Sequence, residues 1–157
     1  CLDAGASGIY FSAQGGETSR FSEETFETAV KPHDLTVLRA AEQAGATFNL
    51  LHVCGESVRL PAYAGYPAHA VNWAPQLGNL SLSDGRELFG RPIVGGIDQR
   101  GPVVDGTPQQ IRAEVRAALG EMGTTGFMLG AGCTVPNEIR IENLVVARQA
   151  AVDAATA

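Results

Sequence analysis

The sequence predicts an α/β fold built on a parallel sheet, either open and doubly wound or closed into a barrel. The main observation is that short apolar runs alternate with helical patterns along the 157 residues, as they do in strand–helix repeats. In addition, 19 glycines and 8 prolines separate the runs, as turn-forming residues do. With 45% hydrophobic residues, the chain can build a core, so we expect one folded domain over 1–157 rather than a disordered segment.

The first elements are a strand followed by helices. A buried strand is expected over 8–13, where an apolar run precedes a pair of glycines. Ser22 predicts a helix N-terminus because the polar Thr25 follows three positions later, as in a partial capping box. Pro32 is expected to interrupt this helix, so that a second helix runs over 33–44.

The middle of the chain continues the alternation. Apolar runs predict strands at 47–52 and, more weakly, at 68–73. A short helix is expected over 83–89, and a fourth strand follows over 92–97.

The last part of the chain supplies a long helix, a strand and a final helix. Thr107 is a candidate N-cap and Pro108 suits a first helical turn, so a helix is expected from Thr107 to Met122. A short fifth strand is expected over 127–129, and a final helix over 137–157.

Charge and composition exclude several classes of partner. The net charge is −6 and Lys31 is the single lysine, so the chain offers no basic stripe for nucleic acid. No apolar run approaches the roughly 20 residues that a membrane span needs. The three cysteines are odd in number and far apart, which does not suit a disulfide framework, so we expect a reducing, cytoplasmic location.

The chain begins with Cys1 rather than with methionine. A mature bacterial lipoprotein also begins with cysteine, but it usually continues into a polar tether. Here residues 2–5 lead almost at once into an apolar run. We therefore expect a fragment of a longer protein rather than a lipidated N-terminus.

Polar and nucleophilic side chains gather where the predicted strands end. This is the edge of the sheet at which parallel α/β folds build their sites. They include Ser12, Gln14, His52, Cys54, Asp98 and Cys133. His52 and Cys54 are two positions apart in an extended segment, so both point to one face, roughly 6–7 Å apart along the strand. Together with Cys133 they offer an imidazole and two thiolates, which suit zinc and leave a fourth position open for chemistry. Inert core thiols are the other interpretation, and the spacing leaves both open.

Six short motifs also run through nearly the whole chain. They are Phe11-Ser12-Ala13-Gln14-Gly15, Phe26 through Pro32, Asn72-Trp73, Gly96-Ile97-Asp98, Gly106-Thr107-Pro108 and Leu129-Gly130-Ala131-Gly132. In this order they resemble motifs of the uroporphyrinogen decarboxylase superfamily, which includes the zinc-dependent corrinoid:thiol methyltransferases.

Two departures from the decarboxylases favour the methyltransferase branch. The decarboxylases carry Leu-Gly-His-Gly near the end, and here Ala131 replaces that histidine. The methyltransferases carry Leu-His-x-Cys-Gly after one strand and Gly-Cys after the last, and this chain has Leu51-His52-Val53-Cys54-Gly55 and Gly132-Cys133. The resemblance therefore implies Zn²⁺ bound by His52, Cys54 and Cys133, which are then both the metal ligands and the catalytic residues.

The resemblance also implies the architecture. The fold of the family is a TIM-type (β/α)8 barrel, typically of about 250 residues or more, so this chain is expected to be its C-terminal part, with about five βα units. Without the N-terminal strands, two sheet edges would be exposed. We therefore expect the chain to associate with the missing N-terminal part or with copies of itself.

The function that the resemblance implies is methyl transfer to a thiol. A methylcorrinoid on a partner protein would donate the methyl group to a small thiol substrate, with Ser12, Gln14 and Asp98 binding the polar tail of the thiol. Two alternatives remain at this point: metal-free decarboxylation of uroporphyrinogen, and a truncated barrel with no activity of its own.

Overall fold

Five parallel strands form the centre of the computed structural model, which describes residues 1–155. The strands are β1 (Tyr10–Ala13), β2 (Leu50–Val53), β3 (Ala70–Asn72), β4 (Ile93–Ile97) and β5 (Phe127–Ala131). They lie side by side in chain order, and each neighbouring pair is parallel. A doubly wound sheet reverses its strand order at a switch point, whereas this continuous order is that of an arc of barrel wall. All five predicted strands are confirmed.

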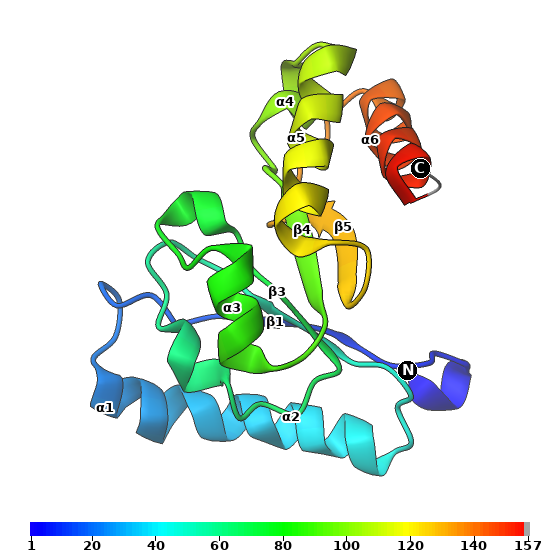
Figure 1. Ribbon diagram of the computed structural model, residues 1–157. Coiled ribbons are helices and arrows are strands. Elements are labelled where there is room, and N and C mark those ends of the chain that lie inside the picture. The colour runs from blue at the N-terminus through cyan, green and yellow to red at the C-terminus, as the bar shows by residue number, and fades with distance from the viewer. Residues whose placement is uncertain (156–157) are drawn as a thin grey trace.

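Helices connect the strands. They are α1 (Glu23–Thr25), α2 (Lys31–Gln43), α3 (Leu82–Phe89), α4 (Pro102–Asp105), α5 (Pro108–Met122) and α6 (Ile141–Ala155). In Figure 1 the longer helices follow one another around the sheet, from α2 at the bottom through α3 and α5 to α6 at the upper right. Short 3-10 turns occupy Leu2–Ala4, Leu60–Tyr63 and Pro75–Leu77.

The break that we predicted at Pro32 is wrong. A π-helical turn over Phe26–Val30 joins α1 to α2, so the chain stays helical from Glu23 to Gln43. Pro32 lies in the first turn of α2, directly after the π-helical turn. A proline is tolerated there because its missing N–H and its ring disturb few hydrogen bonds of the helix.

Other helix boundaries also differ from the prediction. The cap of α5 is confirmed, because Thr107 Oγ1 accepts the N–H of Gln110, whose side chain accepts the N–H of Thr107. The last helix begins at Ile141 rather than at 137, and its predicted end at 156–157 lies outside the described residues. The prediction missed α4, because four residues are too few to show a helical period.

The helices cover one face of the sheet. Leu51, Val71 and Ile93 are in register on β2, β3 and β4, and they pack in the main core with Leu38 of α2 and Phe89 of α3. All five side chains are at most 5% exposed. This face carries most of the hydrophobic burial that stabilises the fold.

The opposite face carries a different row of side chains, because neighbouring residues of a strand point to opposite faces. In register across the sheet, this row is Ser12, His52, Asn72, Val94 and Met128. At the edge strands it is open, with Met128 45% exposed. The polar residues of the row lie on this second face.

Trp73 fills the space beneath α3. Its side chain is fully buried, and its indole N–H donates to the carbonyl of Leu80 at 2.9 Å. Gly85 of α3 lies directly against the indole, since a Cβ added there would be 2.2 Å from two ring carbons. The absence of a side chain at Gly85 therefore allows α3 to approach β3.

Within residues 1–155, none of the helices combines the length and the apolar character that crossing a bilayer requires.

Candidate metal centre

Two of the three candidate ligands come from the end of one strand. His52 is the third residue of β2, and Cys54 follows directly after its last residue, Val53. Because side chains alternate along extended backbone, His52 and Cys54 point to the same face, away from the helices. His52 is 4% exposed, whereas Cys54 is partly exposed and has a free thiol.

The third candidate, Cys133, reaches this face from β5. Two strands separate β2 from β5, and on a flat sheet three strand spacings would put them about 14 Å apart. The distance between Cys54 Sγ and Cys133 Sγ is nevertheless only 3.9 Å. The sheet therefore curves toward this face, and side chains of distant strands meet on its concave side.

The three ligand atoms form a compact triangle. One ring nitrogen of His52 and the Sγ atoms of Cys54 and Cys133 lie within 4.8 Å of one another, and Cys133 Sγ is 3.5 Å from His52 Nε2. A tetrahedral zinc ion, with bonds of about 2.3 Å to sulfur and about 2.05 Å to nitrogen, would separate two sulfurs by about 3.8 Å and a sulfur and a nitrogen by about 3.6 Å. The distances found here, 3.9 Å and 3.5 Å, match these values. These two distances and the chemistry of the three side chains therefore fit a zinc ion with one free vertex.

The ring of His52 has a partner on its other nitrogen. Nδ1 lies 2.6 Å from Oδ1 of Asn72 on the neighbouring strand β3. Burial lowers the pKa of His52, against the opposing effect of the hydrogen bond to Asn72. The imidazole is therefore favoured in its neutral form, which is the form that binds a metal.

Two of the three residues expected to bind substrate, Ser12 and Gln14, lie beside the candidate metal ligands. Ser12 is in register with His52, and its Oγ accepts from Gln14 Nε2 at 3.3 Å. Burial raises the pKa of the Cys54 thiol, and a hydrogen bond from Gln14 acts in the opposite direction. Ser12 and Gln14 are both exposed beside the ligand atoms, where a bound molecule could contact them.

Asp98 is engaged in its own turn. Its Oδ1 accepts the backbone N–H of Arg100 at 2.9 Å, and its own N–H donates to Glu114 at 2.8 Å. It is not part of the group of ligand atoms within 4.8 Å of one another. Its expected contact with substrate stays a prediction.

Sequence reasoning did not assign two neighbours of His52 to the site, although one of them, Asn72, lies in the Asn72-Trp73 motif. Asn72 is 1% exposed, and the Tyr10 hydroxyl donates to its Oδ1 at 3.3 Å. The Tyr10 ring lies 5.8 Å from the imidazole, measured between centroids. A polar residue at the end of an apolar strand was the available signal for Asn72, but the register that pairs it with His52 is not visible in the sequence.

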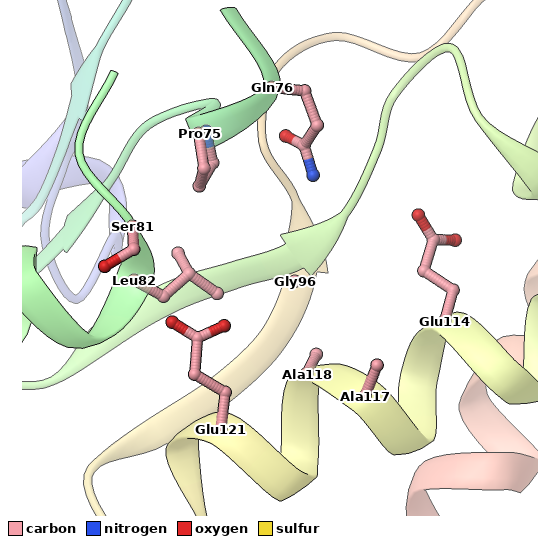
Figure 2. A pocket seen from close by; sticks show the side chains of 9 residues that line it. All are labelled: Pro75, Gln76, Ser81, Leu82, Gly96, Glu114, Ala117, Ala118 and Glu121. Atoms are coloured by element: carbon pink, nitrogen blue, oxygen red, sulfur yellow. The ribbon is translucent and has the colours of Figure 1, made fainter. Parts of the chain in front are cut away.

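A pocket of about 280 Å³ lies apart from these residues, between β4 and α5 (Figure 2). Gln76, Ser81, Glu114 and Glu121 bring the polar groups of its lining. Within the described residues, Glu114 Oε2 is buried without a hydrogen-bond partner. Burial raises the pKa of Glu114, and the charge of Asp98 adds to this effect, against the hydrogen bond from the Asp98 backbone.

This raised pKa predicts a pH dependence of stability. The folded chain favours protonated Glu114 more than the unfolded chain does. The contribution of Glu114 to stability is therefore fully present below the ordinary glutamate pKa of about 4.3, and it is lost as pH rises through the higher pKa of the folded state. In Glu114→Gln the side chain cannot ionise and keeps an oxygen for the N–H of Asp98. Urea unfolding at a series of pH values should therefore show a smaller loss of stability over this window. The same pH dependence of stability in the wild type and in Glu114→Gln would contradict the prediction.

Comparison with known proteins places the fold. A family model described as uroporphyrinogen decarboxylase (URO-D) matches residues 1–154. A solved structure, a methyltransferase from Methanosarcina mazei, is similar with a TM-score of 0.77 and 21% sequence identity, over 98% of this chain and 44% of that one. The chain thus spans less than half the length of this structure, and its sheet is part of a TIM-type barrel. Among curated proteins, none matches the sequence significantly.

The predicted fold class and superfamily are therefore confirmed. The likeness to the methyltransferase is a likeness of fold, whereas the URO-D model covers nearly every residue. The chain belongs to the uroporphyrinogen decarboxylase (URO-D) family.

Proposed function

We propose that this chain carries the metal centre of an enzyme that transfers a methyl group from a methylated corrinoid to a thiol. The observation that carries the proposal is the group of His52, Cys54 and Cys133, in which the distances from Cys133 Sγ to Cys54 Sγ and to His52 Nε2 match a tetrahedral zinc site. Structural zinc sites are usually closed by four protein ligands, whereas three ligands and an open position are typical of catalytic sites.

The donor set suits a nucleophilic thiol. When bound, zinc supplies a Lewis acid that lowers the pKa of a coordinated thiol, so that the substrate is a thiolate at neutral pH. Cys54 and Cys133 would bind as thiolates and His52 as a neutral imidazole. Two thiolate ligands supply much electron density, which keeps the substrate sulfur nucleophilic.

The reaction is a displacement at the methyl carbon. In this reaction the substrate sulfur would form the new S–C bond, the methylcorrinoid would lose its Co–C bond with the electron pair left on cobalt, and the thiol proton would go to solvent. We assign Ser12, Gln14 and Asp98 to the polar tail of the thiol, and the methylcorrinoid to a partner protein. The structural similarity to the methyltransferase from M. mazei supports this branch.

We propose that residues 1–157 are the C-terminal part of a URO-D-like domain. The concave face carries the ligand atoms, and Tyr10 and Met128 on it are 62% and 45% exposed. We propose that the N-terminal part of a barrel, or a second copy of this chain, covers that face. The free thiols of Cys1, Cys54 and Cys133 suit the reducing cytoplasm.

Decarboxylation of uroporphyrinogen is the second candidate, because the matching family model carries that description. It needs no metal and relies on charged groups around the carboxylates of the substrate. Ala131 stands where the decarboxylases have a histidine, and a metal-free reaction gives the His/Cys cluster no role. These two features favour methyl transfer.

One assay separates the two candidates. The purified chain is expected to contain one zinc ion. Together with the remaining part of the barrel, it is expected to methylate 2-mercaptoethanol with methylcobalamin as donor, and the absorbance of the demethylated cobalamin follows the reaction. Removal of zinc with a chelator should stop the reaction, and added zinc should restore it. The control arm contains uroporphyrinogen in place of both substrates. Metal-independent loss of its carboxyl groups, or a chain that binds no zinc, would contradict the proposal.

A further inference from the structure

We propose that Asn72 is a positioning residue of the metal centre, which holds the imidazole of His52 with Nε2 toward the ion and ties it to the strand that leads to Cys133. The inference rests on the proposed function, since it concerns the same site. It adds a residue that does not itself touch the ion.

The amide of Asn72 uses all of its hydrogen-bonding capacity. Its Nδ2 donates to the carbonyls of Val94 at 2.8 Å and Ala131 at 3.0 Å. Its Oδ1 lies 2.6 Å from His52 Nδ1 and accepts from the Tyr10 hydroxyl at 3.3 Å. An amide has two N–H donors and two acceptor lone pairs, so this side chain is fully satisfied at 1% exposure.

These partners determine the orientation of the amide and, through it, the tautomer of His52. A carbonyl oxygen can only accept, so the amide atom between Val94 and Ala131 must be the nitrogen. The oxygen then faces His52 and accepts a hydrogen bond from the protonated Nδ1. The lone pair of the neutral imidazole is left on Nε2, which lies 3.5 Å from Cys133 Sγ.

The same side chain connects the strands that carry the ligands. Asn72 is on β3, His52 on β2, and Ala131 is the last residue of β5, two positions before Cys133. The bond to Ala131 therefore fixes the end of β5 relative to His52. Partners of this kind, beyond the ligands, fix ring orientation and raise metal affinity.

Asn143 provides a control for the effect of losing a buried asparagine that has only a structural role. Asn143 of α6 is 7% exposed, and its Nδ2 also donates to two carbonyls, of Val103 and Val104, at 3.0 and 3.3 Å. It is outside the group of candidate ligands. Asn143→Leu should therefore lower stability without changing the metal centre.

Two substitutions at Asn72 separate its two roles. Asn72→Leu removes every hydrogen bond of the amide. Asn72→Asp keeps an oxygen for His52 Nδ1 but loses both donors to the carbonyls and buries a charge, so its fold should be no more stable than that of Asn72→Leu. If Asn72 were merely structural, the metal centre would be disturbed more in Asn72→Asp than in Asn72→Leu. If Asn72 positions His52, the metal centre is disturbed more in Asn72→Leu.

The experiment measures Zn²⁺ and Co²⁺ binding to the full chain by chelator competition, and counts sulfur and imidazole ligands by X-ray absorption at the zinc edge. We expect about a 10- to 100-fold loss of affinity in Asn72→Leu, together with a weakened imidazole signal. Asn72→Asp should keep the imidazole signal, and Asn143→Leu should keep both the signal and the affinity. Circular dichroism checks that each variant is folded, and Asn72→Ala replaces Asn72→Leu if the latter is not.

The outcomes distinguish the two proposals. A wild-type chain that binds neither metal would overturn the metal centre and the role of Asn72 with it. Wild-type binding combined with unchanged affinity and imidazole signal in Asn72→Leu would overturn the positioning role alone. An imidazole signal lost equally in the leucine and aspartate variants would also overturn it.

Discussion

In the Cys133→Ser chain, zinc affinity is expected to fall by more than the roughly 10- to 100-fold that changes beyond the ligands cause, and the proposed methyl transfer is expected to stop. Cys133 supplies one of the three ligand atoms that lie within 4.8 Å of one another. A serine hydroxyl stays protonated near neutral pH and is a poor replacement for a thiolate on zinc. The remaining ligands, His52 and Cys54, come from a single strand end and cannot enclose the ion.

Cys1→Ser is the matched control for this prediction. Cys1 is also a free cysteine, but it is exposed and lies outside the cluster. Zinc content after dialysis, measured by atomic absorption, should stay at the wild-type level in Cys1→Ser. Equal zinc content in Cys133→Ser and in wild type would show that Cys133 is not a ligand.

Gly85→Ala is expected to lower the free energy of unfolding by about 1–3 kcal/mol, the usual cost of forcing extra volume into a packed core. The new methyl group would lie 2.2 Å from two carbons of the Trp73 ring. Trp73 is fully buried and held by its hydrogen bond to Leu80, so either the ring or α3 has to move. The loss should appear in urea or thermal unfolding.

Gly120→Ala is the matched control, because Gly120 is also inside a helix, α5. A Cβ there would meet nothing within 4 Å. Alanine in place of a helical glycine then increases stability by roughly 0.5–1 kcal/mol. The two substitutions should therefore have opposite signs. A stabilised Gly85→Ala chain would mean that Trp73 moves without cost.

The sequence was sufficient for the elements that depend on local patterns. The strand from Leu50 to Val53 and the cap at Thr107 follow from apolar runs and from the chemistry of helix ends. The break at Pro32 was wrong, because a proline rule applied to the interior of a helix fails where a π-helical turn has already changed the hydrogen bonding. The four residues of α4 fell below the length at which a period can be recognised.

The candidate site was predictable in part. The alternation of side chains along β2 places His52 and Cys54 on one face from the sequence alone. The residues left the membership of Cys133 open, and the family resemblance supplied it, because no local pattern encodes how strongly a sheet curves. Asn72 was missed for a related reason. Its role depends on the register between β2 and β3 and on carbonyls of two further strands, Val94 and Ala131.

The 3.9 Å between the sulfurs of Cys54 and Cys133 spans strands that a flat sheet would hold far apart. An ion bound by both sulfurs would thus connect the ends of β2 and β5 across the concave face. Its binding free energy would add to the stability of the curved sheet. By thermodynamic reciprocity, anything that straightens the arc weakens the ion's attachment. Closure of the barrel wall and retention of its metal would then be two measures of one equilibrium.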